Sequence, residues 1–229
     1  MQLSWRMISF SLFTLVVFAG LVKLGLWQTE RGAQKQALLD TLQAQSNQAP
    51  ADLFAILNTP LPQRHGMPVK LKVTLDAGRS VLLDNKTFEG KVGYQLLVPA
   101  QHQDRHLLVH VGWLPATPDR NEWPAIPQLP TTVWLTGHIK LPSRVPVLND
   151  ALIIERKGAV VRSQTEAPAI LSEALQLPLE PWLVRLDEQA EWGLPRQWQW
   201  LSMGPEKHYG YALQWYSLAL AIFILLLLF

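Results

Sequence analysis

Three histidines recur at intervals of four residues, at positions 102, 106 and 110, and imidazole is the commonest metal-binding side chain in proteins. On a helix, this spacing would place all three side chains on one face and predict a metal site. The flanking residues alternate like a strand instead, and His102 lies in the loop before it. In a strand only His106 and His110 share a face, so the pattern favours a polar hairpin over a metal centre.

Motifs for catalysis are missing from the rest of the sequence. It contains no G-x-S-x-G, H-E-x-x-H, Walker A or G-x-G-x-x-G motif, and Asp84, Glu89 and Asp104 fall in turns, where carboxylates are common. The absence of cysteine excludes disulfides, Cys-ligated zinc and iron–sulfur clusters. A formal net charge of +2 without a run of like charges argues against a nucleic-acid surface. We therefore expect a binding protein and not an enzyme.

One further histidine opens an apolar segment. His208 precedes the run YGYALQWY, and on a helix it shares a face with Tyr211, Ala212 and Trp215. An imidazole above aromatic and small residues at a membrane boundary is suited to bind haem iron axially, with the apolar macrocycle among the helices. The alternative is a solvated polar residue at the membrane interface.

Two long apolar segments predict the helices that hold this histidine. Residues 7–27 contain one charged residue, Lys23, and residues 209–229 contain none. Each is long enough to cross a bilayer as a helix of about 30 Å. Since no A-x-A cleavage site follows the first segment, we expect an uncleaved anchor. We predict transmembrane helices at residues 7–27 and 208–229, with aromatic residues of both flanking only the middle of the chain.

The middle of the chain reads as a short helical stem followed by strands. Residues 28–66 predict a juxtamembrane helix and linker, and residues 67–207 predict a β-rich domain. Many short alternating runs, with 17 prolines and 13 glycines, indicate an antiparallel barrel or sandwich, so the whole is an α+β membrane protein. Strands are predicted at 68–75, 81–83, 93–99, 105–113, 132–139, 151–155, 159–162 and 181–186, with a helix at 167–175. Asp84 and Asn85 are expected to form the turn that ends the second strand.

Four stretches together resemble the surfeit locus protein 1 family. LGLWQTERGAQK (24–35) is similar to the signature that follows the first span in that family, and HYGYALQWYSLA (208–219) resembles the run that opens the second. LLDNKTFEGKVGYQLLVP (82–99) and LLVHVGWLP (107–115) resemble its strand motifs. The sequence departs from the family pattern at four positions: Lys86 replaces an arginine, His110 and Val111 replace an Asn-Arg pair, and Tyr216 replaces a phenylalanine.

The resemblance implies an assembly factor for haem-copper cytochrome c oxidase, which assists the delivery or insertion of haem a into subunit I. The implied partners are subunit I, other oxidase-assembly or haem a synthesis proteins, and membrane lipid. Haem a would be held transiently, with His208 as the ligand of its iron. The residues expected around it are Tyr211, Trp215, Trp27, Arg31 and Lys35, with Arg31, Lys35 and Lys207 near the propionates.

The resemblance also implies a topology. Both termini would be cytoplasmic and the middle domain periplasmic, and because only Arg6 precedes the first span as a basic residue, a bacterial inner membrane is favoured over a mitochondrial one. Two alternatives to the haem-handling function stay open. In the first, the chain is a membrane-anchored adaptor that docks oxidase subunits without binding haem. In the second, it is a membrane-tethered hydrolase with an unrecognised carboxylate site.

Overall fold

The structure is a computed structural model that describes residues 5–142, 154–201 and 203–228. The chain forms two compact units. One comprises residues up to Leu42 together with residues from Gln199 onward, and the other comprises Gln43–Trp198. The first unit is helical, and the second carries every strand of the described chain.

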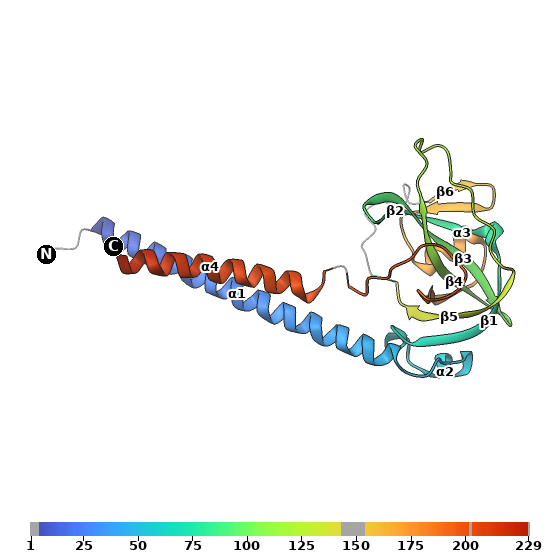
Figure 1. Cartoon of the computed structure of the whole chain (residues 1–229), viewed down its shortest axis with the longest axis horizontal. Coiled ribbons are helices and arrows are strands. Elements are labelled where there is room, and N and C mark those ends of the chain that lie inside the picture. Colours follow the sequence, from blue (N-terminus) through green and yellow to red (C-terminus); the bar gives the residue numbers. More distant parts are fainter. Residues whose placement is uncertain (1–4, 143–153, 202, 229) are drawn as a thin grey trace. The chain divides into compact units, whose positions relative to one another are not determined.

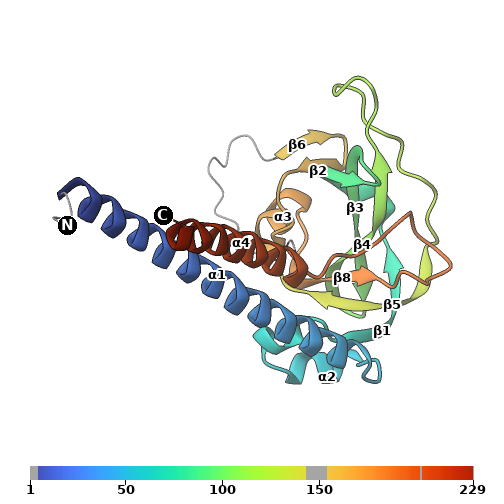
Figure 2. The same ribbon diagram turned by 60° about the vertical axis from the view of Figure 1, so that its left-hand side comes forward.

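Two antiparallel helices, α1 (Trp5–Ser46) and α4 (Pro205–Leu228), account for the helical unit. They lie side by side (Figure 1, Figure 2), and the rings of Phe18 and Phe223 meet at a centroid distance of 6.2 Å. Both helices are long and apolar enough to cross a membrane. Only 6% and 11% of their most apolar stretches are buried, whereas a core helix of a soluble protein would bury most of its apolar residues. The two predicted transmembrane helices are confirmed, and α1 continues into the predicted juxtamembrane helix.

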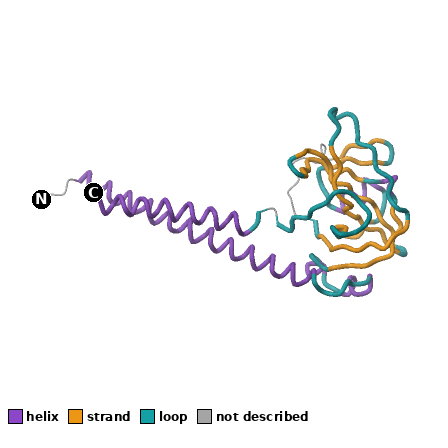
Figure 3. The backbone as a smooth tube through the Cα atoms, viewed as in Figure 1, coloured by secondary structure: helices purple, strands orange, loops and turns teal. Residues whose placement is uncertain are grey.

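Five strands of the second unit close into a barrel, visible as the strands on the right of Figure 3. Around the barrel they follow the order β1, β5, β8, β4, β3, and β3 pairs back with β1 at Thr74–Gln101 and Leu75–Ala100. Neighbouring strands are antiparallel except β4 and β8. The bounds are β1 (Pro68–Leu75), β3 (Lys91–His102), β4 (Arg105–Pro115), β5 (Thr132–Lys140) and β8 (Leu179–Leu186).

Strand β3 is the longest strand described, and its length lets the barrel carry an extension. One edge of β3 pairs with β4, while its other edge pairs with β2 over residues 91–97 and with β1 beyond them. The sheet continues outward from β2 to β7 and β6, and the β2–β7 pairing is parallel. The remaining elements are α2 (Leu53–Asn58), η1 (Leu61–Arg64), η2 (Ala77–Arg79), β2 (Val81–Phe88), β6 (Ile154–Lys157), β7 (Val160–Ser163) and α3 (Pro168–Leu175).

The barrel has the strand order of an OB-fold. Taken along the chain its five strands are β1, β3, β4, β5 and β8, and in space the fifth lies between the third and the fourth. The first and second strands close the ring. This arrangement is a five-stranded Greek-key barrel, with β2 inserted between its first two strands. The fold alone does not define a function, since OB-folds serve many.

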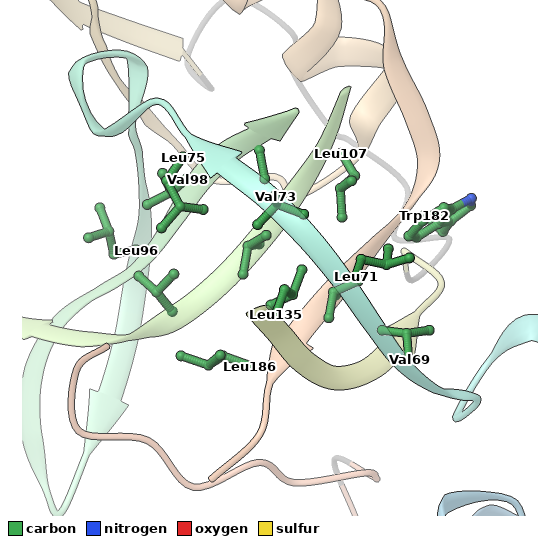
Figure 4. Packing of buried hydrophobic residues seen from close by; sticks show 14 of the residues in the cluster. Val69, Leu71, Val73, Leu75, Leu96, Val98, Leu107, Leu135, Trp182 and Leu186 are labelled. Atoms are coloured by element: carbon green, nitrogen blue, oxygen red, sulfur yellow. The ribbon is translucent and has the colours of Figure 1, made fainter. Parts of the chain in front are cut away.

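Alternating side chains fill two apolar layers, one inside the barrel and one outside it. Along β1 the residues alternate between buried and exposed after the first position, as the period of a half-buried strand requires. Inward-facing side chains such as Leu71, Leu135 and Trp182 form the interior core (Figure 4). The opposite faces of the strands contribute Leu97, Leu108 and others to a second cluster, which α3 covers.

The predicted β-rich α+β architecture is confirmed. The sheet differs from the prediction in being mixed, because two of its strand pairs are parallel. The strand predicted at 68–75 has the observed bounds, and the helix predicted at 167–175 begins one residue later. Strand β8 begins two residues before its predicted start, and β3 is longer than its prediction at both ends. Most of the run predicted at 151–155 lies outside the described residues, and β6 begins at Ile154.

The prediction of a turn at Asp84 and Asn85 was wrong, because β2 continues through both residues to Phe88. Leu83 pairs with Gln95 and Lys86 pairs with Gly93, so two residues of β2 oppose one residue of β3 in a β-bulge. Asn85 takes a positive φ of 58°, which asparagine tolerates better than most residues. The Asp84 carboxylate is nearly buried and accepts a hydrogen bond from Arg120 at 2.7 Å, which replaces the solvation that a turn would have provided.

A close approach of β5 to β8 at Gly137 makes the barrel sensitive to one added methyl group. A Cβ at Gly137 would overlap the carbonyl oxygen of Arg185 and lie 2.9 Å from Val184 Cγ1. We expect Gly137→Ala to lower the melting temperature by roughly 3–10 °C, since overpacking typically costs about 1–3 kcal/mol. Thermal unfolding in detergent, followed by near-ultraviolet circular dichroism, measures the effect.

Gly78→Ala is the matched control, because the nearest atom to its added Cβ is Asp76 Oδ1 at 3.5 Å, an ordinary contact. Its melting temperature should stay close to that of the parent. If both variants lowered the melting temperature equally, the close β5–β8 contact at Gly137 would not be the cause of the effect.

Candidate functional site

The less exposed residues of α1 and α4 recur at alternating spacings of three and four. This heptad period is the pattern of a coiled coil, in which one stripe of each helix faces its partner. On α1 the stripe consists of Thr14, Phe18, Leu21, Gly25, Gln28, Gly32, Lys35 and Leu39. On α4 it consists of Pro205, His208, Ala212, Trp215, Ala219 and Ile222. These two stripes form the helix seam, and His208 is one of its members.

Two glycines of α1 let tyrosine rings of α4 pack against its backbone. A Cβ at Gly25 would lie 2.5 Å from Tyr216 Cε1, and a Cβ at Gly32 would lie 2.6 Å from Tyr209 Cε1. The two contacts lie seven residues apart on each helix, so the same glycine–tyrosine contact repeats after two helical turns. Small residues at such positions are typical of closely packed membrane helices. Thr29 adds a hydrogen bond of 3.3 Å between its hydroxyl and that of Tyr216.

Next to Tyr209, His208 is joined to the opposite helix by a hydrogen bond. Its Nδ1 lies 2.8 Å from Oε1 of Gln28, and both side chains are half-buried in the helix seam. An amide oxygen can only accept, so Nδ1 donates, and in the neutral form of such a ring the lone pair is on Nε2. Within the described part of the chain, no residue hydrogen-bonds Nε2. A ring with this tautomer can act as a metal ligand through Nε2.

The structure distributes the residues predicted around His208 between the helix seam and the helix surface. Trp215 and Lys35 are half-buried members of the seam. Trp27 and Tyr211 are exposed by 50% and 45%, so they face outward from the helix pair. Arg31 is exposed and donates from Nη1 to Gln34 Oε1 at 3.0 Å, along its own helix. Arg31 and Lys35 therefore differ in exposure, although they lie four residues apart on α1.

Gln28 is the residue that the sequence analysis did not place in the site, although it lies within the first membrane-boundary motif. The signal that identifies it is the heptad series of Gly25, Gln28, Gly32 and Lys35, read together with the stripe on α4. A polar side chain at a core position of that series requires a partner on the other helix. His208 and Trp215 are the members of the second stripe with polar side-chain groups, and the structure pairs Gln28 with His208.

A cavity of about 310 Å³ adjoins the beginning of α4. Leu39, Trp200 and Leu201 provide apolar walls, and Glu206 and Lys207 provide charged ones. This volume lies at the low end of the range for ligand pockets, so the cavity suits one part of a large ligand and not a whole macrocycle. Lys207, predicted near the propionates, is an exposed residue at this place.

The barrel has a larger cavity of about 470 Å³ at one end, lined by His106, Arg79 and Asp76 among others. Its charged groups already satisfy each other, because Arg79 Nε lies 2.5 Å from Asp76 Oδ2. The smaller cavity of the helical unit includes Lys207, the residue directly before His208. We therefore place the candidate site on the helix seam and not in the barrel.

The other histidines considered as metal ligands occupy different environments. His102 has Nδ1 2.8 Å from the Lys72 carbonyl oxygen, and His106 is half-buried on β4. His110 is fully buried and stacks on Trp198, with ring centroids 5.1 Å apart and an interplanar angle of 7°. Neither of its ring nitrogens has a hydrogen-bond partner among the described residues. The described chain brings no three His, Asp or Glu side chains together as a metal site.

Burial lowers the pKa of His110 well below 6.5, and the nearby cations Lys140, Arg185 and Lys86 lower it further. Burial also lowers the pKa of His65 and of His138. These rings are therefore kept neutral in the folded barrel. The cations near His110 and His65 also oppose the binding of a metal cation there.

An apolar helix pair with a half-buried histidine, joined to a domain built on a five-stranded barrel, defines a membrane-anchored α+β protein. A model of the SURF1 family matches residues 15–220, which run from within α1 to within α4, so the chain belongs to the SURF1 family. Members of this family are known as assembly factors for cytochrome c oxidase. A comparison with curated proteins finds no significant match. The resemblance inferred from the membrane-boundary and strand motifs is thereby confirmed.

His110 is expected to make the barrel sensitive to acid. Below about pH 6.5 the unfolded chain binds a proton at this position and the folded chain does not, so stability falls with pH by up to about 1.4 kcal/mol per unit. We expect His110→Phe, which keeps a ring on Trp198, to reduce the loss of melting temperature between neutral pH and pH ~5.5.

Val109→Ala is the control, because it removes apolar contacts of the same strand and no titratable group. It should lower the melting temperature at both pH values and leave the difference between them unchanged. If the melting temperature of His110→Phe falls between neutral pH and pH ~5.5 by as much as that of the parent, His110 is not the cause of the acid sensitivity.

Proposed function

We propose that this protein assists the delivery or insertion of haem a into subunit I of cytochrome c oxidase, by holding the haem at the helix seam with His208. The observation that carries the proposal is the hydrogen bond from His208 Nδ1 to Gln28, which leaves Nε2 free among the described residues. Haem a is then a cargo that the protein holds transiently. The bound haem would supply an iron that accepts a nitrogen ligand, and His208 would provide that nitrogen.

The residues around His208 suit such a cargo. The membrane spans of α1 and α4 present apolar side chains to any macrocycle that lies along them, and Trp215 is half-buried seven residues after His208. Lys35, Arg31 and Lys207 carry positive charge close to the end of the apolar spans, where carboxylates of a membrane-embedded ligand reach water. The cavity beside Lys207 has the volume for a peripheral group of the ligand.

The barrel domain would contact the oxidase subunits and the proteins that synthesise haem a. Its outer surface exposes Trp134 by 59%, with Lys70 Nζ 5.5 Å from the centre of that ring. An exposed aromatic residue beside a cation is typical of a protein contact surface. The same observation favours the second candidate, an adaptor that docks oxidase subunits without binding haem. The membership of an assembly-factor family leaves the hydrolase alternative without support.

Replacing the proposed ligand tests the function directly. Protein produced in cells that synthesise haem a should show a Soret absorption band, and His208→Ala should abolish it, because no other residue is proposed to bind the iron. Arg31→Ala should weaken haem retention less severely, since it would remove a charge and not a metal bond. Absorption spectra and the haem a content of the purified protein measure both effects.

His102→Ala is the matched control, because His102 lies at the loop end of β3. It should retain the Soret band, and membrane insertion should be equal in all variants. A parent without a Soret band, or a His208→Ala variant with unchanged spectrum and unchanged oxidase maturation, would exclude the ligand role and leave the adaptor.

The proposal includes a bacterial inner-membrane location with cytoplasmic termini and a periplasmic barrel. Aromatic residues at the boundary of both spans, on the side of the barrel, favour this hairpin topology. Cytoplasmic reporter fusions at both termini should be active, and protease added to spheroplasts should cut between residues 43 and 198. Termini on opposite sides of the membrane, or a barrel cut only after lysis, would refute this topology.

A further inference from the structure

Gln28 and His208 are 180 positions apart in the chain and share a hydrogen bond of 2.8 Å. Each occupies a core position of the heptad series, with Gly25 and Gly32 flanking Gln28 on α1. The tyrosine rings that pack against those glycines show that the two helices lie close together next to the bond. The glutamine amide is therefore held at a defined distance from the ring, and not at the end of a freely rotating side chain.

An imidazole that is neutral can carry its proton on either nitrogen, and the choice decides which nitrogen is able to bind a metal. The acceptor opposite Nδ1 makes this choice, because an amide oxygen has lone pairs and no proton. In apolar surroundings a polar group without a partner is strongly disfavoured, so the bond to Gln28 has more influence here than it would in water. It also restricts rotation of the ring about its two side-chain torsions.

We propose that Gln28 is a positioning residue, which holds His208 as the Nδ1-protonated tautomer and aims Nε2 away from the bond as the atom available to iron. This inference rests on the proposed function of His208 as a haem ligand. Residues that hydrogen-bond the second nitrogen of a metal-binding histidine typically affect metal affinity by about 10–100-fold. Gln28 has the geometry of such a residue, although it touches no metal itself.

Three substitutions at Gln28 separate the acceptor from the shape of the side chain. Gln28→Leu keeps the approximate volume and removes the acceptor. Gln28→Glu keeps the acceptor and adds charge, which increases the basicity of the histidine toward a metal. Gln28→Asn keeps the amide on a chain one methylene shorter, which places the acceptor out of reach at the observed helix separation. Thr29→Val is the matched control, because it removes the neighbouring bond to Tyr216 and leaves Gln28 intact.

The tautomer can be measured without haem. In protein labelled with ¹⁵N-histidine and purified without haem at alkaline pH, the resonances that disappear in His208→Ala belong to His208, one of six histidines. The parent should show a protonated Nδ1 and an unprotonated Nε2. Gln28→Leu and Gln28→Asn should give averaged shifts from both tautomers, and Thr29→Val should resemble the parent. A protonated Nε2 in the parent, or unchanged shifts in Gln28→Leu, would overturn the inference.

The second measurement uses protein loaded with haem a. Gln28→Leu should lower haem a affinity by about 10–100-fold, whereas Gln28→Glu should retain binding and raise the iron–histidine stretching frequency in resonance Raman spectra. If the parent binds haem a and Gln28→Leu binds it equally well with the same Raman signature, the positioning role is wrong while the proposed function stands. If the parent binds no haem, the proposed function fails, and the inference that depends on it fails with it even where the nitrogen shifts identify the expected tautomer.

Discussion

The close approach of the two membrane helices is the constraint on which the candidate site depends. Within a bilayer, apolar side chains gain little by leaving lipid, so helices associate through close packing and polar contacts. Here, the packing comes from tyrosine rings of α4 that lie against Gly25 and Gly32 of α1. Larger side chains at these two glycines would displace the tyrosine rings from the α1 backbone. Gln28 lies between the two glycines on α1, so its bond to His208 forms where the helices already pack closely.

The barrel depends on a comparable constraint, which is the length of β3. A strand of 12 residues can pair with β4 on one edge and share its other edge between β2 and β1. The bulge at Asp84 and Asn85 bends β2 next to this edge, and the ion pair of Asp84 with Arg120 holds the bulge in place. Closure removes the free edges that an open sheet of this size would expose. The extension through β7 and β6 begins at β2, where the pairing of β3 with β1 has not yet begun.

Local periodicity was sufficient to predict most elements, because each depends on neighbouring residues. The alternation at Pro68–Leu75 and the absence of proline after Trp27 led to correct predictions of β1 and of the continuation of α1. The bulge at Asp84 was missed, since the Arg120 side chain that stabilises it is 36 positions away. Barrel closure and the parallel β4–β8 pairing were likewise not predictable, because strand alternation contains no information about partners. For the candidate site, the position of His208 before an apolar segment and the motif resemblance both led to its prediction, but the partner of its Nδ1 became evident only when both helices were considered together.

The presence of a Gln–His pair in the helix seam is itself an argument about function. The glycine–tyrosine contacts and the Phe18–Phe223 contact already supply packing along the helix pair, and apolar residues at positions 28 and 208 would pack there without any polar group to satisfy. A hydrogen bond between membrane helices contributes only about 0.6 kcal/mol on average, so stability gives weak reason to keep this one. Under the proposed function, the second nitrogen of His208 is the atom that would bind a ligand. The first nitrogen then needs an acceptor on the facing helix, and Gln28 supplies it.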